Sequence, residues 1–172
     1  MYIHYKPEVF LHAVPFRSVG TKRAADRSGP DVRRGANRPQ DKGVDNIVTL
    51  VLTGNEIVKL SEKMREIGLR EFGKAEGHFA RDAANILQAQ AVVLIGVKRT
   101  WYGLPYCSMC GFANCGECKK ARANCAFAPM DLGIALSSAA GVAADMRVDN
   151  RILFSAGKAA EEMDYAGGED II

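Results

Sequence analysis

The sequence lacks several features that would assign it to a common functional class. No hydrophobic run is both long enough and free enough of charge to cross a membrane, and the first residues do not form a signal-peptide pattern. The three histidines are scattered, and neither a Ser-His-Asp arrangement nor a glycine-rich phosphate loop is visible. We therefore expect a cytoplasmic protein that is not bound to a membrane, and nothing indicates triad or phosphate-loop chemistry.

Cysteine is absent from most of the chain and concentrated in one stretch. The five cysteines are Cys107, Cys110, Cys115, Cys118 and Cys125. In a reducing cytosol such a group is more often metal-binding or catalytic than disulfide-bonded, and an odd number cannot pair completely within one chain. Gly111, next to Cys110, suits a close approach of the backbone to a bound group. The stretch at about 100–126, called the cysteine loop below, is therefore the candidate site.

The spacing of the cysteines fits more than one metal centre. Cys107, Cys110, Cys115 and Cys125 can supply four thiolates to a [4Fe-4S] cluster, which is the interpretation we favour. The pairs 107/110 and 115/118 have zinc-knuckle spacing, although only four residues separate them. The spacing of residues 110, 115 and 118 is that of a plant-type two-iron ferredoxin. Cys118 is left over in the favoured set and is the alternative ligand.

Charge and hydrophobic pattern divide the chain near residue 43. Residues 1–42 carry nine basic and four acidic residues and show no helical or strand periodicity, whereas the remaining 130 residues carry 14 basic and 16 acidic ones. A basic arm is typical of nucleic-acid binding, but we interpret it differently below and expect no nucleic-acid partner. The sequence predicts a disordered or non-native-looking segment over 1–42 and a folded domain over 43–172.

Hydrophobic patterns in the second part predict both strands and helices. Two β-branched apolar runs predict buried strands at 47–52 and 91–97, and shorter strands are expected at 151–154 and from 170 onward. Helices are expected at 55–68, with Asn55 as N-cap, and at 74–87, 129–146 and 156–163. This mixture predicts an α+β fold.

Several segments together resemble a family of uncharacterised prokaryotic proteins containing a ferredoxin domain (DUF2148). The resemblance covers residues 43–172 and rests on the segments 43–47, 79–83, 91–96, 110–112, 125–127, 131–136 and 148–151. It implies a ferredoxin-containing domain over 43–172, in which Cys107, Cys110, Cys115 and Cys125 ligate a [4Fe-4S] cluster. The cysteine loop also resembles the small iron–sulfur domain of electron-transfer complexes. The implied function is electron transfer with a redox partner protein.

A weaker resemblance is to flavin nitroreductases. It rests on the apolar run 91–97 and on a later helix that opens with Asp131, Gly133 and Ala135. It implies a nitroreductase-like α/β sandwich with the cysteine loop inserted, a homodimer, and FMN contacted by Asp45 and Asn46. A flavin-dependent oxidoreductase that uses the cluster as an electron relay is thus one alternative to simple electron transfer, and a zinc-stapled non-redox protein is another.

Residues 1–42 depart from the family, which has a helix ahead of the position of Gly43. When residues 31–42 are read back into codons from the second base, the allowed products match the end of that helix. One base lost from a guanine run spanning Lys42, Gly43 and Val44 would produce this difference. We therefore interpret residues 1–42 as an out-of-frame translation, which would remove the arginine and lysine that are expected to bind the flavin phosphate.

Overall fold

A computed structural model of the chain describes residues 2–4, 44–73, 77–168 and 170–172. The described strands are β1 (Tyr2–His4), β2 (Ile47–Leu52), β3 (Ala91–Val97) and β4 (Asp149–Arg151). The described helices are α2 (Asn55–Phe72), α3 (His78–Ile86), α4 (Cys115–Lys120), α5 (Phe127–Asp145) and α6 (Phe154–Glu162). The expected mixture of helices and strands is confirmed.

The strands form one antiparallel sheet in the order β2-β3-β1-β4. β2 and β3 make the longest ladder, in which Ile47 pairs with Val97 and Leu52 pairs with Val92. β1 pairs with β3 only near residues 91–92, so it leaves the edge of β3 near Val97 unpaired. The C-terminal residues occupy that edge: Val97 and Ile172 exchange backbone hydrogen bonds of 3.1 and 2.8 Å.

Alternate residues of the two long strands face opposite layers of helix. Leu50, Leu52, Val92 and Leu94 pack on one face with the buried residues of α2, α3 and α6. The odd-numbered residues of β2 and β3 pack on the other face against small residues of α5, which include three buried alanines at 128, 135 and 139. The period of two in the strands therefore places the sheet between two helical layers.

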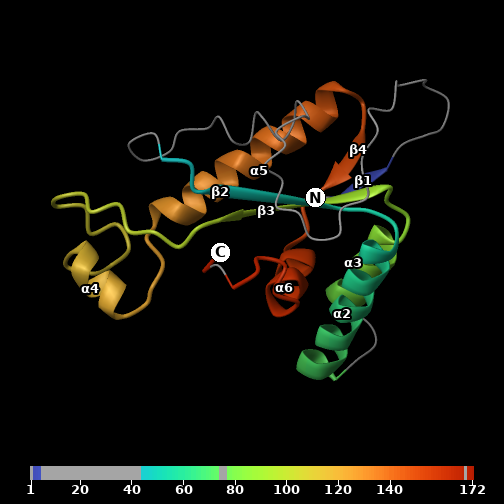
Figure 1. Ribbon diagram of the computed structural model, residues 1–172, viewed down its shortest axis with the longest axis horizontal. Helices are drawn as coiled ribbons and strands as arrows, with labels where there is room; N and C mark the ends of the chain where they lie inside the picture. Colours follow the sequence, from blue (N-terminus) through green and yellow to red (C-terminus); the bar gives the residue numbers. More distant parts are fainter. Residues whose placement is uncertain (1, 5–43, 74–76, 169) are drawn as a thin grey trace.

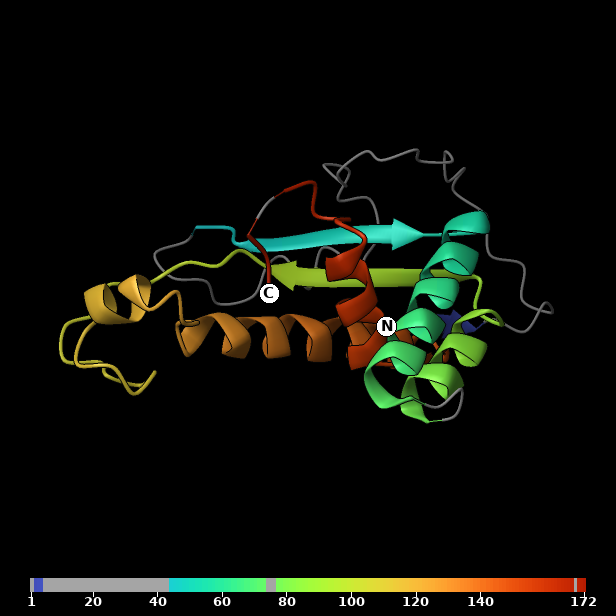
Figure 2. The same ribbon diagram turned by 90° about the horizontal axis from the view of Figure 1, so that it is seen from below.

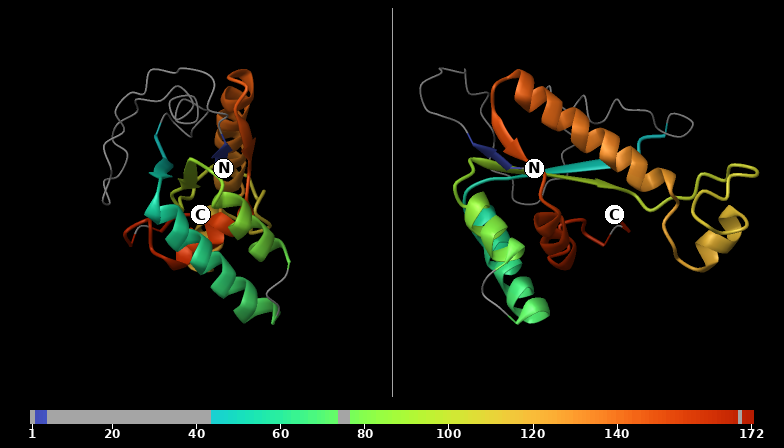
Figure 3. Two further views of the ribbon diagram at one scale, coloured as in Figure 1. Left: turned by 90° about the vertical axis from the view of Figure 1, so that its right-hand side faces the viewer. Right: turned by 180° about the vertical axis from the view of Figure 1, so that it is seen from behind.

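The helical layers are unequal, and the cysteine loop lies outside both of them. Among the described helices, α5 alone crosses one face of the sheet, and α2, α3 and α6 gather on the other (Figures 1 and 2). The loop with α4 projects from the end of the sheet where β3 leaves and α5 begins, as the right view of Figure 3 and the side view of Figure 2 show. The core thus supports the loop from one side only.

Several predicted boundaries agree with the structure and others need correction. The strands at 47–52 and 91–97 are confirmed to the residue. The strand expected from 170 onward is reduced to an isolated bridge between Ile171 and Lys98, beside the backbone hydrogen bonds of Ile172 with Val97. Asn55 is not the N-cap of α2, because Gly54 holds that position at φ 55° and no side chain caps the helix. The last strand lies at Asp149–Arg151 rather than 151–154, because its position is set by pairing with β1.

The N-terminal segment is tested only at its start. Tyr2–His4 forms β1 in the middle of the sheet, where the sequence predicted no strand. Residues 5–42 lie outside the described residues, so their interpretation as an out-of-frame translation stays a prediction.

Among the described helices, α5 is long and apolar enough to cross a membrane by length and composition alone. In this fold, 28% of its most apolar stretch is buried.

Candidate metal centre

The cysteine loop leaves β3 and returns to α5 through two stems that are hydrogen-bonded to each other. The indole N–H of Trp101 donates to the carbonyl of Ala123 at 3.0 Å. The guanidinium of Arg99 donates to the side chain of Asn124 at 2.6 Å and to the carboxylate of Asp170 at 2.8 Å. These contacts fix the distance between the two ends of the loop, which limits where its cysteines can lie.

A buried aromatic pair holds the base of the loop against α5. The ring of Tyr102 stacks on Phe127 with centroids 5.6 Å apart and planes 12° from parallel. Its hydroxyl donates a hydrogen bond to the carboxylate of Asp131, and both residues are buried. The nitroreductase resemblance has this helix open with Asp131, but α5 begins four residues earlier, at Phe127. Asp131 therefore anchors the incoming stem rather than capping the helix.

Left-handed backbone conformations recur around the first two cysteines. Tyr106, Ser108 and Gly111 have φ values of 55°, 45° and 82°, and Gly111 N–H donates to the carbonyl of Ser108 at 3.0 Å. Non-glycine residues rarely adopt positive φ, and such conformations gather at ligand-binding loops. Left-handed residues that alternate with other conformations can also turn backbone N–H groups toward one side of a loop, where they favour an anionic group.

The short helix α4 determines the position of the fourth cysteine. The side chain of Asn114 accepts a hydrogen bond from the backbone N–H of Glu117 at 3.0 Å and so starts the helix. Cys118 lies one turn after Cys115 and is fully buried. An Asn followed three residues later by Glu is a helix-start signal that sequence reasoning could have used here.

The five thiols lie in different environments. Cys118 and Cys125 are 0% and 5% exposed, whereas the other three are half-buried. The Cys118 thiol faces the carbonyl oxygens of Ala123 and Asn124 at 3.4 and 3.6 Å, so it is buried against polar backbone. Burial raises the pKa of Cys118, and the neighbouring Cys110 raises it further.

The pKa of Cys110 is lowered, whereas that of Cys118 is raised. The backbone N–H of Phe112 donates to its sulfur and lowers the pKa of Cys110, and a hydrogen bond with the Cys118 thiol lowers it further. A thiolate is the form that binds metal. Of this pair, Cys110 is therefore the thiol closer to the metal-binding state, with Cys118 beside it as a hydrogen-bond donor.

The structure brings together only part of the predicted ligand set. Cys118 interacts electrostatically with both Cys110 and Cys125. For Cys107 and Cys115, no hydrogen-bond partner of the side chain occurs within the described ranges. No three His, Cys, Asp or Glu side chains in the described part of the chain are already arranged to hold a metal ion. Soft thiolates still fit an iron–sulfur cluster or zinc, but binding requires the loop to bring its thiols closer together.

The two residues expected to contact FMN lie at the same end of the sheet as the loop. The carbonyl of Asn46 accepts a hydrogen bond from Lys98 N–H at 2.8 Å, and the Asn46 side chain is largely buried. The carboxylate of Asp45 accepts from the backbone N–H of Ile47 at 3.2 Å, which fixes the start of β2. Both residues therefore have structural roles, and their contact with FMN stays a prediction.

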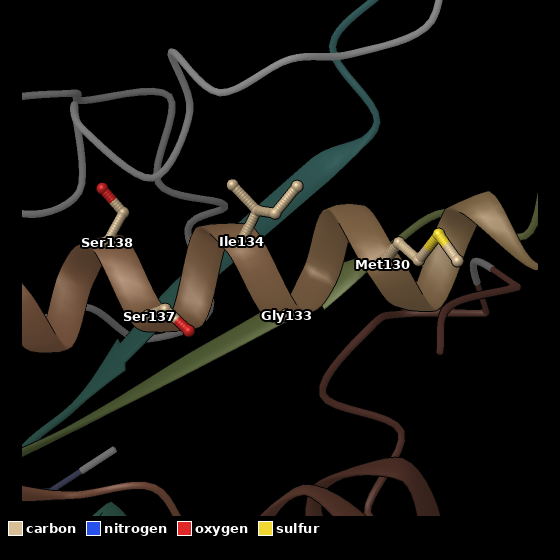
Figure 4. Close-up of a pocket in the computed structure, with 5 residues that line it drawn as sticks. All are labelled: Met130, Gly133, Ile134, Ser137 and Ser138. Carbon is tan, nitrogen blue, oxygen red and sulfur yellow. The ribbon is translucent and has the colours of Figure 1, made fainter.

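The outer face of α5 carries a shallow hollow. Figure 4 shows its lining, and all of it comes from this one helix: Met130, Gly133, Ile134, Ser137 and Ser138. None of these side chains titrates or acts as an ordinary metal ligand in the way that thiolates and imidazoles do. Within the described residues, metal-binding chemistry is therefore concentrated in the cysteine loop.

Comparisons with known proteins agree with this location. An uncharacterized protein of Archaeoglobus fulgidus (strain ATCC 49558) is 36% identical over 163 residues, an alignment that covers 90% of this chain and 85% of the relative. That coverage exceeds residues 43–172, so it also includes part of 1–42. No solved structure matches the chain, so the nitroreductase resemblance has no support from structures. Residues 121–172, which include Cys125, match the family described as uncharacterized proteins containing a ferredoxin domain (DUF2148), and the chain belongs to that family.

Proposed function

We propose that this protein transfers electrons through a [4Fe-4S] cluster held by the cysteine loop. The observation that carries the proposal is the arrangement of thiols on this loop, where the buried Cys118 interacts with Cys110, whose pKa is lowered, and with the buried Cys125. The family's ferredoxin domain indicates iron–sulfur chemistry without fixing the cluster type. The bound cluster would supply one-electron chemistry, and the chain's residues would hold it and limit its contact with solvent.

Cys110 and Cys125 belong to the ligand set that the spacing favours. Cys107 and Cys115 complete that set, and Cys118 is the alternative ligand. Left-handed residues on both sides of Cys107 and directly after Cys110, namely Tyr106, Ser108 and Gly111, would give the loop a backbone shape suited to an anionic group. The ring of Trp101 lies between the two stems and would cover one side of a bound cluster, which is a common way to restrict solvent.

The test is anaerobic purification followed by measurement of iron, acid-labile sulfide, zinc and flavin. We expect the iron and sulfide content of a [4Fe-4S] cluster and a broad visible absorbance that reductant bleaches. Serine variants at each cysteine identify the ligands, with Ser108→Ala as a matched change on the same loop. Iron should fall in the serine variants at 107, 110, 115 and 125 and persist in Cys118→Ser.

Other outcomes would replace the proposal. If Cys118→Ser loses iron while Cys107→Ser or Cys115→Ser keeps it, Cys118 replaces that residue in the ligand set. A colourless protein with one zinc would indicate the zinc-stapled alternative, and two irons per chain would indicate the smaller cluster. Bound FMN would support the alternative function as a flavin-dependent oxidoreductase. Light scattering measures the molar mass and so tests the expected homodimer.

A further inference from the structure

The cysteine loop exposes large apolar side chains at its tip. Tyr106 is fully exposed, Met109 is 58% exposed and Leu104 is 37% exposed. All three belong to the cysteine loop, which projects beyond the sheet (Figure 2). Exposed Tyr and Met side chains are enriched where proteins meet other proteins. An apolar tip beside the thiols is therefore suited to contact by a partner.

Positive charge accompanies this apolar tip. The cysteine loop contains three basic residues and one acidic residue, whereas the rest of residues 43–172 contains 11 basic and 15 acidic residues. Lys120 extends into solvent with its side chain 77% exposed, and Arg122 is also exposed. Lys119 lies over the ring of Trp101 at 5.6 Å. Within residues 43–172, the cysteine loop is therefore net positive and the remainder is net negative.

We propose that the tip of the cysteine loop is the docking surface for an acidic redox protein. This inference rests on the proposed electron-transfer function and names the kind of partner that the site accepts. Charge complementarity carries it, because a basic surface on an otherwise acidic domain orients the metal site toward a negatively charged partner. Leu104, Tyr106 and Met109 would form the apolar centre of the contact, and Lys120 and Arg122 its rim.

The experiment compares electron transfer from the reduced, iron-loaded protein to two probes of opposite charge. The probes are an acidic flavodoxin and a basic cytochrome c, and the rate constants are measured by stopped flow across ionic strength. We expect the rate to flavodoxin to fall with added salt and the rate to cytochrome c to rise or stay flat. Reversing two charges in Lys120→Glu/Arg122→Glu should slow transfer to flavodoxin about tenfold at low salt and much less at high salt. Lys119 is left in place so that its contact with Trp101 survives.

The control makes the same charge change elsewhere. Lys59→Glu/Lys158→Glu alters two exposed lysines, each of which pairs with a glutamate three residues away, as Lys120 does. The control variant should transfer electrons to flavodoxin at nearly the unmodified rate. The reduction potential should be unchanged in both variants.

Three results would overturn the docking surface while leaving the proposed function intact. The first is equal slowing by both double variants. The second is a shift in the reduction potential that accounts for the slowing. The third is tight binding of a duplex oligonucleotide through Lys120 and Arg122, with no preference for flavodoxin over cytochrome c. An absence of iron would instead overturn the electron-transfer function itself. Iron loading is therefore measured on every variant before its kinetics.

Discussion

Removing the hydrogen bond from Tyr102 to Asp131 should lower the free energy of unfolding by more than removing an exposed tyrosine–carboxylate hydrogen bond. Its acceptor is a carboxylate that is only 9% exposed, and Tyr102 is the one donor recorded for it among the described residues. Tyr102→Phe removes the donor and leaves the carboxylate buried. A buried group that loses its partner costs about 1–3 kcal/mol, and more when it is charged. We therefore expect the free energy of unfolding to fall by about 1.5–3 kcal/mol.

The chain offers a matched control for this change. Tyr165 also donates to a carboxylate, that of Glu56, at 3.0 Å. The Glu56 side chain is 37% exposed and also pairs with Lys59 at 2.7 Å, so it keeps water and a cation when the hydroxyl is lost. Tyr165→Phe should therefore cost at most about 1 kcal/mol.

The assay is urea denaturation followed by circular dichroism, with metal loading matched across the variants. Adding Asp131→Asn closes a double-mutant cycle, and we expect Asp131 and Tyr102 to show a coupling energy of about 1 kcal/mol or more. Equal losses from Tyr102→Phe and Tyr165→Phe would refute the reasoning. So would a loss below about 0.5 kcal/mol for Tyr102→Phe, which is the range of ordinary surface changes.

Three further predictions concern the scaffold. Ser155→Ala removes a hydroxyl that donates to the buried carboxylate of Asp82 at 2.7 Å, and it should lower the free energy of unfolding by about 1–3 kcal/mol. Hydrogen bonds from Arg70 hold the pKa of Glu162 at about 2, below the ordinary 4.5, so the pair's contribution is complete above pH 4.5 and lost as pH falls toward 2. Urea denaturation of Glu162→Gln should accordingly show a shallower loss of stability over that range than the unmodified protein. Gly96→Ala would place a Cβ 2.5 Å from the side chain of the penultimate residue, so denaturation should reveal a cost of about 1–3 kcal/mol and faster hydrogen exchange at the C-terminus.

The elements that sequence reasoning located best are those whose own residues determine them. The strands at 47–52 and 91–97 are mainly β-branched apolar runs that helices cover on both faces, so their limits coincide with the limits of the apolar pattern. The long helix was expected at 129–146 and is found at Phe127–Asp145, because its alanines repeat on one face. Local composition was sufficient in these cases.

The strands that were missed or misplaced, β1 and β4, depend on residues far away in the sequence. β1 is three residues long, and it is a strand because Tyr2 pairs with Val92 and with Arg151. No local pattern of three residues can reveal such partners. Pairing with β1 also moved β4 to Asp149–Arg151 and left Phe154 to begin α6.

The candidate site was predicted in part. Its place in the sequence was evident from the concentration of cysteines, but the interior position of Cys118 was not. That position depends on α4, which turns Cys118 away from solvent, and on the stems, which supply the carbonyl oxygens it faces. Spacing alone treats every cysteine as equally available, whereas the fold leaves some half-exposed and buries others. The choice between Cys118 and its neighbours as ligands therefore belongs to experiment.

The burial of the cysteines is hard to explain by packing alone. Cys118 and Cys125 are buried, yet neither belongs to the hydrophobic clusters that join the sheet to its helices in the described part of the chain. Those clusters consist of aliphatic and aromatic residues from both helical layers. A buried thiol that faces backbone carbonyls contributes little packing to such a core, and an alanine or serine side chain would fit the same space. Since neither thiol belongs to those clusters, we propose that a bound group with sulfur ligands accounts for their position on this hydrogen-bonded loop better than packing does.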